Sequence, residues 1–352
     1  MRVDAPQLQN RTVRVSTLFA IVTLAAVLCA CSETNTQELK IHHLMPPRAP
    51  AHTKFIVPWC EKIEKESEGE LKCRIYPAMQ LGGAPTQLYD QVKDGVVDVI
   101  WTIPGYSAGR FPSIEVFELP FMMKSAEATS KALWDYVAEN KLGEFDDVHL
   151  LALHVHGPGY FHMVDKPVTG RSDLQGLKIR APTRQTNKLI EQLGATPVGM
   201  PIPQVPEALA KGVIDGTIVP YEIVPAIKAD ELTKFHSETD ASEPAIYTTT
   251  LLFAMNKARY EGLSARQKEV LDANSGVELS GWAGKVFAEA DAAGKATLDP
   301  QSINVIPRSE IREWQQLAQP VVQGWVDDMN QRGADGSALL NSARRLTQKH
   351  NP

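Results

Sequence analysis

Short apolar segments alternate with segments of helical periodicity through the first part of the chain. Residues 39–45, 71–77 and 96–101 have the length and apolar character of strands. Apolar residues recur near helical spacing over 52–67, and a second helix is predicted over 85–93. This β–α–β–α–β order is typical of an α/β fold, so we expect a mostly parallel sheet here.

The same order begins again after residue 150. The strands and helices predicted there are, in chain order, 150–155, 177–182, 183–193, 206–211 and 213–219. A helix, the motif Gly-Val-(Val/Ile)-Asp and a strand follow one another twice, at 93–101 and at 210–219. This repeat predicts two similar α/β lobes.

The segments that follow are expected to join the two lobes. Residues 248–255, apolar and rich in threonine, predict a strand that crosses back between them. No low-complexity linker separates the lobes, which favours lobes joined by crossing strands. The expected domains are 38–155 plus about 246–285 for lobe I, 156–245 plus about 286–325 for lobe II, and 326–352 for a C-terminal helical tail.

The first thirty-one residues have a different pattern from the rest of the chain. Arg2, Arg11 and Arg14 precede an apolar run over 18–30. At about 13 residues this run is shorter than the roughly 20 that a membrane-spanning helix needs. The pattern predicts a secretory signal peptide over 1–31, and therefore export to the periplasm.

The four cysteines belong to two different features. The run Leu28-Cys29-Ala30-Cys31 resembles the lipobox of bacterial lipoproteins, although cysteine at its second position is unusual. Two outcomes stay open: lipidation of Cys31, or ordinary cleavage nearby that leaves a soluble periplasmic protein. Cys60 and Cys73 are expected to form a disulfide in an oxidising compartment, with two buried free thiols as the alternative.

The charge of the chain argues against two kinds of partner. The whole chain has 36 Lys and Arg against 42 Asp and Glu, a formal charge of −6, and without the leader's three Arg and one Asp the charge is −8. No long basic block occurs, which argues against nucleic acid or an anionic membrane surface. A lipid anchor is then the only expected contact with a membrane.

Seven short motifs carry a resemblance to a known family. Over residues 39–330 the chain resembles the DctP-like substrate-binding proteins of TRAP (tripartite ATP-independent periplasmic) transporters. The motifs stand in the family's order: Tyr76-Pro77 before Gln80-Leu81-Gly82-Gly83, Gly95-Val96-Val97-Asp98, Phe117-Glu118-Leu119-Pro120-Phe121, Asp173-Leu174-Gln175-Gly176-Leu177-Lys178-Ile179-Arg180, Leu193-Gly194-Ala195-Thr196-Pro197-Val198, Gly212-Val213-Ile214-Asp215-Gly216 and Met255-Asn256-Lys257.

The resemblance implies a fold, a partner and a mode of action. The fold would be the two-lobed α/β fold of type II-like periplasmic binding proteins, with a ligand cleft between the lobes and a long helix bracing both. The lobes would close on a small organic anion like a hinge. The partners would be the small and large membrane permease subunits of a TRAP transporter, driven by an ion gradient. No cofactor and no metal are expected.

Arg180 is the leading candidate for ligand binding. It stands near the end of the otherwise apolar strand 177–182, and α/β folds place ligands at the carboxyl ends of strands. The planar guanidinium matches a carboxylate with two parallel hydrogen bonds. From the residues alone, a surface arginine paired with an acidic neighbour is an equal alternative. The family places its carboxylate-binding arginine in this motif, so the resemblance favours the ligand role.

Two differences from related proteins narrow the chemical class of the expected ligand. Sialic-acid-binding relatives have a second arginine near the position of Tyr160, and an asparagine where this chain has Val219 before Pro220. Relatives that bind oxo-acids through a metal have a Glu-Trp pair at Ile218-Val219. We therefore expect one dominant anionic group and a less polar remainder, as in an aromatic acid or a short hydroxy- or oxo-acid. A C4-dicarboxylate or a sulfonate is the alternative.

Aromatic, imidazole and carboxyl side chains near strand ends are candidates for holding the rest of the ligand. They can stack on a ring or hydrogen-bond to a hydroxyl or oxo group. Ordinary packing or helix capping is the alternative for each one. The candidates are His43, Trp101, His154, His156, Tyr160, Tyr221 and Glu222, with Tyr106 and His52 beside them.

Two other function classes are compatible with parts of the sequence. His154 and His156, two apart on a strand, would lie on one face like two metal ligands of an enzyme. However, no nearby HxxxH, CxxC or HExxH motif supplies a third ligand. A binding protein rather than an enzyme is therefore expected. A periplasmic sensor subunit that reports the ligand to a membrane protein would have the same sequence features.

Overall fold

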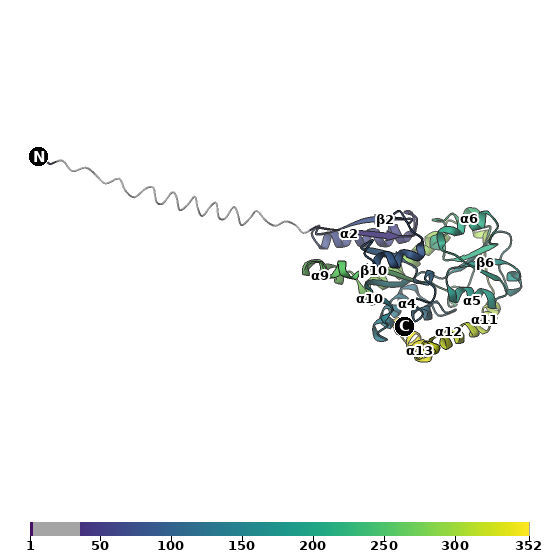
Figure 1. Ribbon diagram of the computed structural model, residues 1–352. Helices are drawn as coiled ribbons and strands as arrows, with labels where there is room; N and C mark the ends of the chain where they lie inside the picture. Colours follow the sequence, from purple (N-terminus) through teal and green to yellow (C-terminus); the bar gives the residue numbers. More distant parts are fainter. Residues whose placement is uncertain (3–35, 352) are drawn as a thin grey trace. The chain divides into compact units, whose positions relative to one another are not determined.

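Two β-sheets form the framework of the folded chain (Figure 1). The computed structural model describes residues 1–2 and 36–351, and Glu38–Pro352 form one compact unit. Nearly all of the predicted signal peptide lies outside the described residues. Cys31 lies outside them as well, so lipidation of this residue stays a prediction.

The first sheet is mixed rather than mostly parallel. Its strands β1 and β3 are parallel, whereas β10 runs antiparallel to both β3 and β4. The predicted crossing strand is present as β10, and it enters this sheet from β9 of the second sheet. The expected parallel pairing is confirmed for β1 and β3, but the sheet as a whole is mixed because β10 returns antiparallel between β3 and β4. The strand order is β2 (Leu71–Tyr76), β1 (Gln37–His43), β3 (Val99–Thr102), β10 (Thr250–Asn256) and β4 (Val148–Val155).

The second sheet is also mixed. Strand β6 pairs in parallel with β7 and β8, and β5 pairs antiparallel with β8 and β9. The short strands β5, β7 and β9 were not predicted from the sequence. The strand order is β11 (Ile303–Val305), β9 (Phe235–Glu238), β5 (Tyr160–Met163), β8 (Gly216–Val219), β6 (Lys178–Ala181) and β7 (Thr196–Gly199).

Helices cover the sheets and continue to the end of the chain. The first helical segment is a π-helix, η1 (Ala51–Ile56), that continues directly into α2. The α-helices are α2 (Val57–Glu66), α3 (Leu88–Lys93), α4 (Ala126–Glu139), α5 (Arg184–Gln192), α6 (Val205–Ala210), α7 (Ala229–Leu232), α8 (Lys257–Glu261), α9 (Ala265–Ala273), α10 (Gly276–Lys295), α11 (Arg308–Leu317), α12 (Gln319–Gln331) and α13 (Gly336–His350).

The long helix α10 contacts elements of both sheets. It packs on α4 and β4, and also on the short turn η8 (Tyr221–Ile223) that follows β8. Two glycines allow this close approach: a Cβ at Gly284 would collide with the carbonyl of Ala126, and one at Gly294 with the carbonyl of Tyr221. Helix α10 therefore occupies the place of the expected bracing helix.

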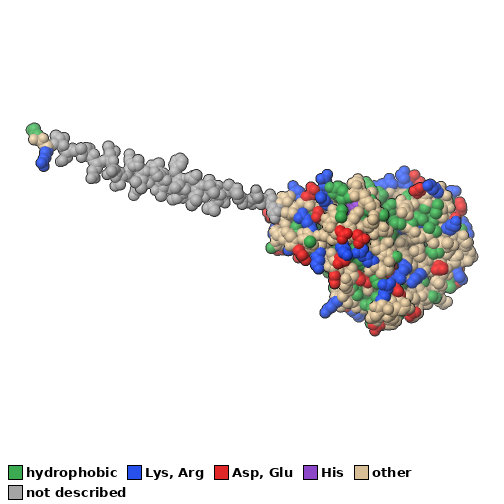
Figure 2. All heavy atoms as spheres, in the orientation of Figure 1, with side chains coloured by type: hydrophobic (Ala, Val, Ile, Leu, Met, Phe, Trp, Pro, Cys, Tyr) green, Lys and Arg blue, Asp and Glu red, His purple; other side chains and the backbone are tan. Residues whose placement is uncertain are grey.

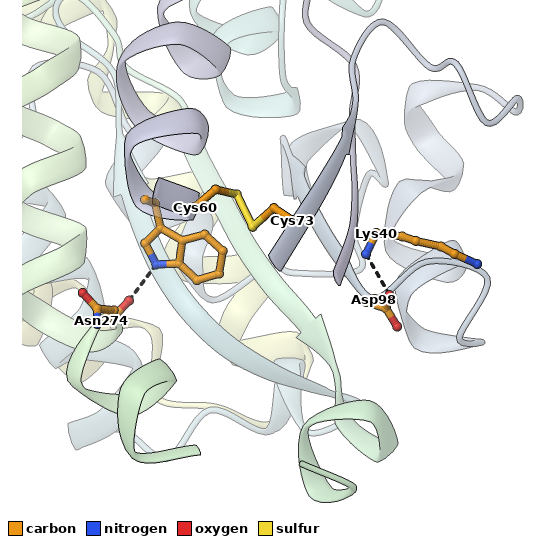
Figure 3. The surroundings of a disulfide bond; sticks show 6 residues. Lys40, Cys60, Cys73, Asp98 and Asn274 are labelled. Carbon is orange, nitrogen blue, oxygen red and sulfur yellow. Dashed lines mark hydrogen bonds between the residues drawn. A yellow bond between two sulfur atoms is a disulfide. The ribbon is translucent and has the colours of Figure 1, made fainter. Parts of the chain in front are cut away.

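The repeated Gly-Val-(Val/Ile)-Asp motif makes the same contact in both sheets. Asp98 accepts a hydrogen bond from the backbone N–H of Lys40 on β1 (2.8 Å; Figure 3), and its own N–H donates to the Lys40 carbonyl (3.1 Å). Asp215 pairs in the same way with Lys178 on β6 (2.7 and 2.8 Å). The motif thus joins the strand that follows it to the parallel neighbour of that strand.

The strands after these motifs begin later than predicted. Strand β3 begins at Val99 and β8 at Gly216, and the preceding Val96 and Val213 are 60% and 48% exposed. Their backbone N–H groups still bond to carbonyls of the preceding helices. The hydrophobic pattern extends the strands too far because it cannot separate a turn valine from a buried strand valine.

The C-terminal helices pack into the hydrophobic cores of both sheets. Trp314 on α11 is buried in the core around the second sheet. Trp325 on α12 is buried in the other core, and its indole N–H donates to the Pro112 carbonyl (2.8 Å). Helix α12 contacts α5 and α13 packs on α4 (Figure 1). The predicted boundary at residue 326 falls inside α12, and the expected C-terminal tail packs against the rest of the fold.

Charges of both signs are mixed over the surface of the folded unit that Figure 2 shows. No broad area of Lys and Arg alone is visible on that face. Among residues 1–2 and 36–351, no helix combines the length and apolar character needed to cross a bilayer.

A disulfide joins α2 to β2 (Figure 3). Cys60 and Cys73 have Cα atoms 5.8 Å apart and are separated by 13 positions. Breaking a cross-link over a loop of this size is expected to lower the free energy of unfolding by about 3 kcal/mol. We predict this loss for the double variant Cys60→Ser/Cys73→Ser of residues 32–352, measured by urea denaturation. A reducing agent should shift the midpoint of the wild type but not that of the variant; equal midpoints for the two proteins would contradict the prediction.

Candidate functional site

Arg180 lies on β6 with its side chain almost fully buried (1% exposed). The strand places it between β7 and β8 in the second sheet. Its Nε–H donates to the Met200 carbonyl (3.0 Å), and Nη1 to the Ile218 carbonyl (3.4 Å). Nη2 donates to the Tyr106 hydroxyl (3.4 Å). These contacts fix the plane of the guanidinium.

All three of these contacts are made to uncharged oxygens. No carboxylate among the described residues forms an ion pair with Arg180, although many other arginines and lysines of the chain have such partners. Burying a cation without a counter-charge costs several kcal/mol. The position therefore suits an anion that comes from outside the protein.

The side chain of Arg180 lines a pocket whose walls come from both sheets and from α10. Its cavity volume is only about 30 Å³, far below the roughly 300–1,000 Å³ of small-molecule sites, so the walls must move apart to admit a ligand. The other lining residues are Met45, Trp101, Ile103, Tyr106, His156, Pro182, Ile202, Val219, Pro220, Glu222, Ile223, Tyr247, Thr249, Leu251 and Phe287.

Most of the pocket wall is apolar or aromatic. The rings of Trp101 and Phe287 stack with an interplanar angle of 19° and centroids 6.1 Å apart. Val219, at the position of an asparagine in the sialic-acid binders, lines the pocket together with Pro220. A wall of this kind holds a flat apolar body, while Arg180 supplies the only positive charge among the lining residues of this pocket.

Three polar side chains of the pocket are already hydrogen-bonded. His156 Nδ1 lies 2.6 Å from the Gly157 carbonyl. Burial, with a smaller contribution from the charge of Arg180, lowers the pKa of His156 to about 4, so the ring is neutral near pH 7. The Tyr247 hydroxyl donates to the Ile218 carbonyl (2.9 Å), and that of Tyr106 accepts from a backbone N–H.

Glu222 is the acidic residue of the pocket. It lies in η8, where its backbone N–H donates to Asp291 Oδ1 on α10 (2.8 Å). Burial, together with the negative charge of Asp291, raises the pKa of Glu222 well above its usual value. Burial also raises the pKa of Asp291 to about 7. An uncharged Glu222 can share the pocket with an anionic ligand.

The family model of bacterial extracellular solute-binding proteins, family 7, named DctP, matches residues 41–328. The chain belongs to this family. The resemblance found in the sequence motifs is confirmed, and so is the two-lobed α/β fold that it implied. The family consists of bacterial extracellular solute-binding proteins, so this DctP-family protein has a solute-binding role.

Solved structures of TRAP solute-binding proteins match nearly the whole folded unit. One from Rhodoferax ferrireducens, in complex with copurified benzoate, is 53% identical and has a TM-score of 0.88; the match covers 90% of this chain and 99% of that chain. One from a marine metagenome, specific for aromatic acid ligands and bound to 3-hydroxybenzoate, is 44% identical with the same coverage and a TM-score of 0.87. One from Bordetella bronchiseptica, with bound mandelate, is 29% identical, covers 89% and 99%, and has a TM-score of 0.81.

The DctP-family fold brings only part of the predicted site together. Arg180, Trp101, His156 and Glu222 line the pocket, as does Tyr106. The other candidates lie outside its lining, where each has a partner of its own.

His154 lies behind the pocket wall. It accepts a hydrogen bond from the indole N–H of Trp101 (3.0 Å), and its ring lies 5.4 Å from that of Phe55 and 4.9 Å from that of Phe287. Strand β4 ends at Val155, so the alternation that would place His154 on the same face as His156 stops before His156. The structure thus makes His154 a support for Trp101.

Tyr160, Tyr221 and His43 are also held away from the pocket lining. The rings of Tyr160 and Tyr221 lie 4.9 Å apart, and the Tyr221 hydroxyl donates to Glu238 Oε2 (3.0 Å). His43 Nε2 lies 3.0 Å from His52 Nδ1. Of the alternatives considered for these residues, packing describes their contacts in the structure, together with side-chain hydrogen bonds.

Several lining residues were missed in the sequence. Tyr247 and Thr249 lie just before the crossing strand β10, and Phe287 lies in the middle of α10. Met45 follows β1. None of them has a local motif that separates it from a core residue. Only the meeting of distant elements makes them part of one pocket.

A stretch beside the pocket matches a hydrolase pattern. Residues 105–109 read Gly-Tyr-Ser-Ala-Gly, the G-x-S-x-G spacing of a nucleophile elbow. The Ser107 hydroxyl donates to the Thr86 carbonyl (3.3 Å), and no described histidine hydrogen-bonds to it. An elbow also needs a strand-to-helix turn, whereas this serine follows a short 3₁₀ turn, Pro104–Tyr106. Among the described residues, Ser107 therefore lacks both the histidine hydrogen bond and the backbone turn of a catalytic serine.

Proposed function

We propose that this protein captures a small aromatic monocarboxylate outside the cytoplasm and delivers it to the membrane subunits of a TRAP transporter. The observation that carries the proposal is the buried, uncompensated guanidinium of Arg180 in an otherwise apolar and aromatic pocket. A carboxylate would neutralise it through two parallel hydrogen bonds, and a ring would pack against the apolar and aromatic side chains once the walls have moved apart to admit it.

The relatives support this choice of ligand class. The three solved structures described above hold benzoate, 3-hydroxybenzoate and mandelate, each an aromatic ring with one carboxylate. A C4-dicarboxylate is less well matched, because the lining residues include no second arginine or lysine for its other carboxylate.

Capture would work through closure of the two sheets around the ligand. The pocket wall takes Trp101 from the first sheet and Arg180 from the second, so a ligand that contacts both stabilises the closed arrangement. The chain passes between the sheets at β4–β5 and at β9–β10, where hinge motion would be absorbed. Delivery to permease subunits rests on the family alone.

A thermal-shift screen of residues 32–352, followed by calorimetry, tests the ligand class. The panel is benzoate, 3-hydroxybenzoate, mandelate, benzenesulfonate, succinate, malate and glucose. A monocarboxylate at about 100 times its Kd should raise Tm by roughly 5 °C, the equivalent of about 2.7 kcal/mol. Binding of succinate or malate, or of glucose, without binding of any aromatic acid would contradict the proposal.

A further inference from the structure

We propose that Glu222 is a second polar contact of the pocket and selects aromatic acids that carry a ring hydroxyl group. This inference rests on the proposed function and narrows its ligand class. Benzoate itself would then be a weaker ligand than one of its hydroxylated forms.

The burial of Glu222 without a hydrogen-bond partner is the first reason. The residue is 5% exposed, and its Oε2 atom is fully buried with no partner among the described residues. Its backbone is held by Asp291 on α10, so the position of the side chain is anchored. A buried polar atom left without a partner costs about as much as a broken hydrogen bond, and a ligand group at this place would remove that cost.

The charge balance of the pocket is the second reason. Arg180 is the single cation of the lining, and a ligand carboxylate neutralises it. An ionised Glu222 would repel that ligand, whereas burial and the neighbouring Asp291 raise the pKa of Glu222 and so favour its protonated form. A protonated carboxyl group both donates and accepts, and a hydroxyl group does the same, so the two are matched partners.

The placement of Glu222 relative to Arg180 is the third reason. Arg180 on β6 pairs with Thr217 on β8, and η8 follows that strand directly. The apolar Val219 and Pro220 stand between Thr217 and Glu222 in the chain, and both line the pocket. The wall therefore offers an anion site, an apolar stretch and a neutral polar group. A ring with one carboxylate and one hydroxyl offers the same three features.

Two alternatives compete with this assignment. Thr249 Oγ1 is also buried without a partner in the pocket, and it could meet the hydroxyl instead. Glu222 additionally borders an open outer groove that contains Arg48, Lys54 and Glu289, so it could serve that groove rather than the ligand. Variants of each residue separate these possibilities.

The test is calorimetric measurement of Kd at pH 7 for benzoate, 3-methylbenzoate, 3-hydroxybenzoate and 4-hydroxybenzoate. A methyl group is larger than a hydroxyl and cannot form a hydrogen bond. With benzoate as the unsubstituted reference, the ratio of the 3-methylbenzoate Kd to that of the better hydroxybenzoate reports the gain from hydrogen bonding. The wild type should prefer that hydroxybenzoate by at least about tenfold. Glu222→Met, similar in size and apolar, should lower the ratio to within about twofold of unity, and Glu222→Gln should keep part of the preference.

The controls decide which residue is responsible. Glu289→Gln changes a carboxylate of the outer groove that does not line the pocket, and it should keep the wild-type ratio. A lost preference in Thr249→Val but not in Glu222→Met would overturn the proposal, as would equal affinity of the wild type for methyl and hydroxyl forms. In those cases the proposed function stands, since aromatic acids still bind.

Failure of all four acids to bind the wild type would instead reject the proposed function. If Glu222→Met does not fold, the nearly isosteric Glu222→Gln decides: an unchanged ratio rejects the assignment.

Discussion

Replacing Arg180 by alanine is expected to weaken binding of an aromatic monocarboxylate by roughly 30- to 5,000-fold. This corresponds to about 2–5 kcal/mol, the usual loss when one partner of a buried charge pair is removed. The ligand carboxylate would enter an apolar pocket without its counter-charge, while the hydroxyls of Tyr106 and Tyr247 are already hydrogen-bonded. Calorimetry with benzoate and 3-hydroxybenzoate on the folded variant measures the effect.

Two further variants show whether geometry or charge is lost. Arg180→Lys keeps the positive charge but not the planar fork, so it should recover only part of the affinity. Lys188→Ala removes a nearby cation on α5 that does not line the pocket, and it should change Kd by less than about twofold. The unliganded Arg180→Ala protein should unfold at or above the wild-type temperature, because removal of an unpaired buried cation relieves a burial cost. An affinity within threefold of wild type in a folded Arg180→Ala protein would reject the anchor role.

The residues of the site that could be predicted share one property. Trp101 and Arg180 lie in or at the end of strands that the apolar pattern made visible, and His156 and Glu222 closely follow such strands. In α/β folds these strand ends are where ligands bind, so a polar side chain there is a reasonable candidate. The same rule also selected Tyr160 and Tyr221, which pack against each other, because chain position does not fix the direction of a side chain.

The parts of the fold that escaped prediction depend on distant contacts. Strand β7 contains a proline and is only partly buried, and β5 and β9 each contain a buried histidine that faces the other, His162 Nδ1 lying 2.8 Å from His236 Nδ1. Such segments lack the apolar run of a core strand. The repeated Gly-Val-(Val/Ile)-Asp motif was visible because its contact is made by the motif itself. The antiparallel pairing of β10 with β3 and β4 could not be predicted, since no residues within β10 itself specify the direction in which it pairs.

The variant Glu118→Gln is expected to be more stable than the wild type at pH 8, by up to about 3 kcal/mol, and about equally stable at pH 4.5. Glu118 ends the turn η4 (Ile114–Glu118) and is 1% exposed. Its Oε1 accepts hydrogen bonds from the backbone N–H and the hydroxyl of Thr250, at the start of β10 (3.0 and 2.6 Å). Its Oε2 is buried with no hydrogen-bond partner among the described residues. Glutamine keeps the accepting oxygen and cannot ionise.

The direction of this effect follows from the pKa of Glu118. Burial, with a smaller contribution from the negative charge of Glu115, raises it from 4.5 to about 7. The unfolded chain loses this proton near pH 4.5 while the folded protein keeps it, so the stabilisation by the protonated form is lost as the pH rises from about 4.5 to 7. Asp291, with a pKa of about 7, adds a loss of the same sign. The lowered pKa values of buried His154 and His162, about 3, act oppositely: they favour folding above about pH 6.5 and lose this effect as the pH falls.

These other groups titrate alike in the wild type and the variant, so the difference between the two proteins isolates Glu118. Urea denaturation at half-unit steps from pH 4.5 to 8 should give unfolding free energies that separate steadily with rising pH. Glu139→Gln, which alters a carboxylate exposed on α4, should follow the wild-type curve at every pH. A constant gap between Glu118→Gln and the wild type would mean that Glu118 is ionised in the folded protein throughout.

Since Thr249 of the pocket precedes Thr250 directly, a charged Glu118 would also place a negative charge next to the pocket wall. The affinity for an aromatic anion should then fall above pH 7 in the wild type more than in Glu118→Gln, which gives the same carboxyl group a second and independent readout.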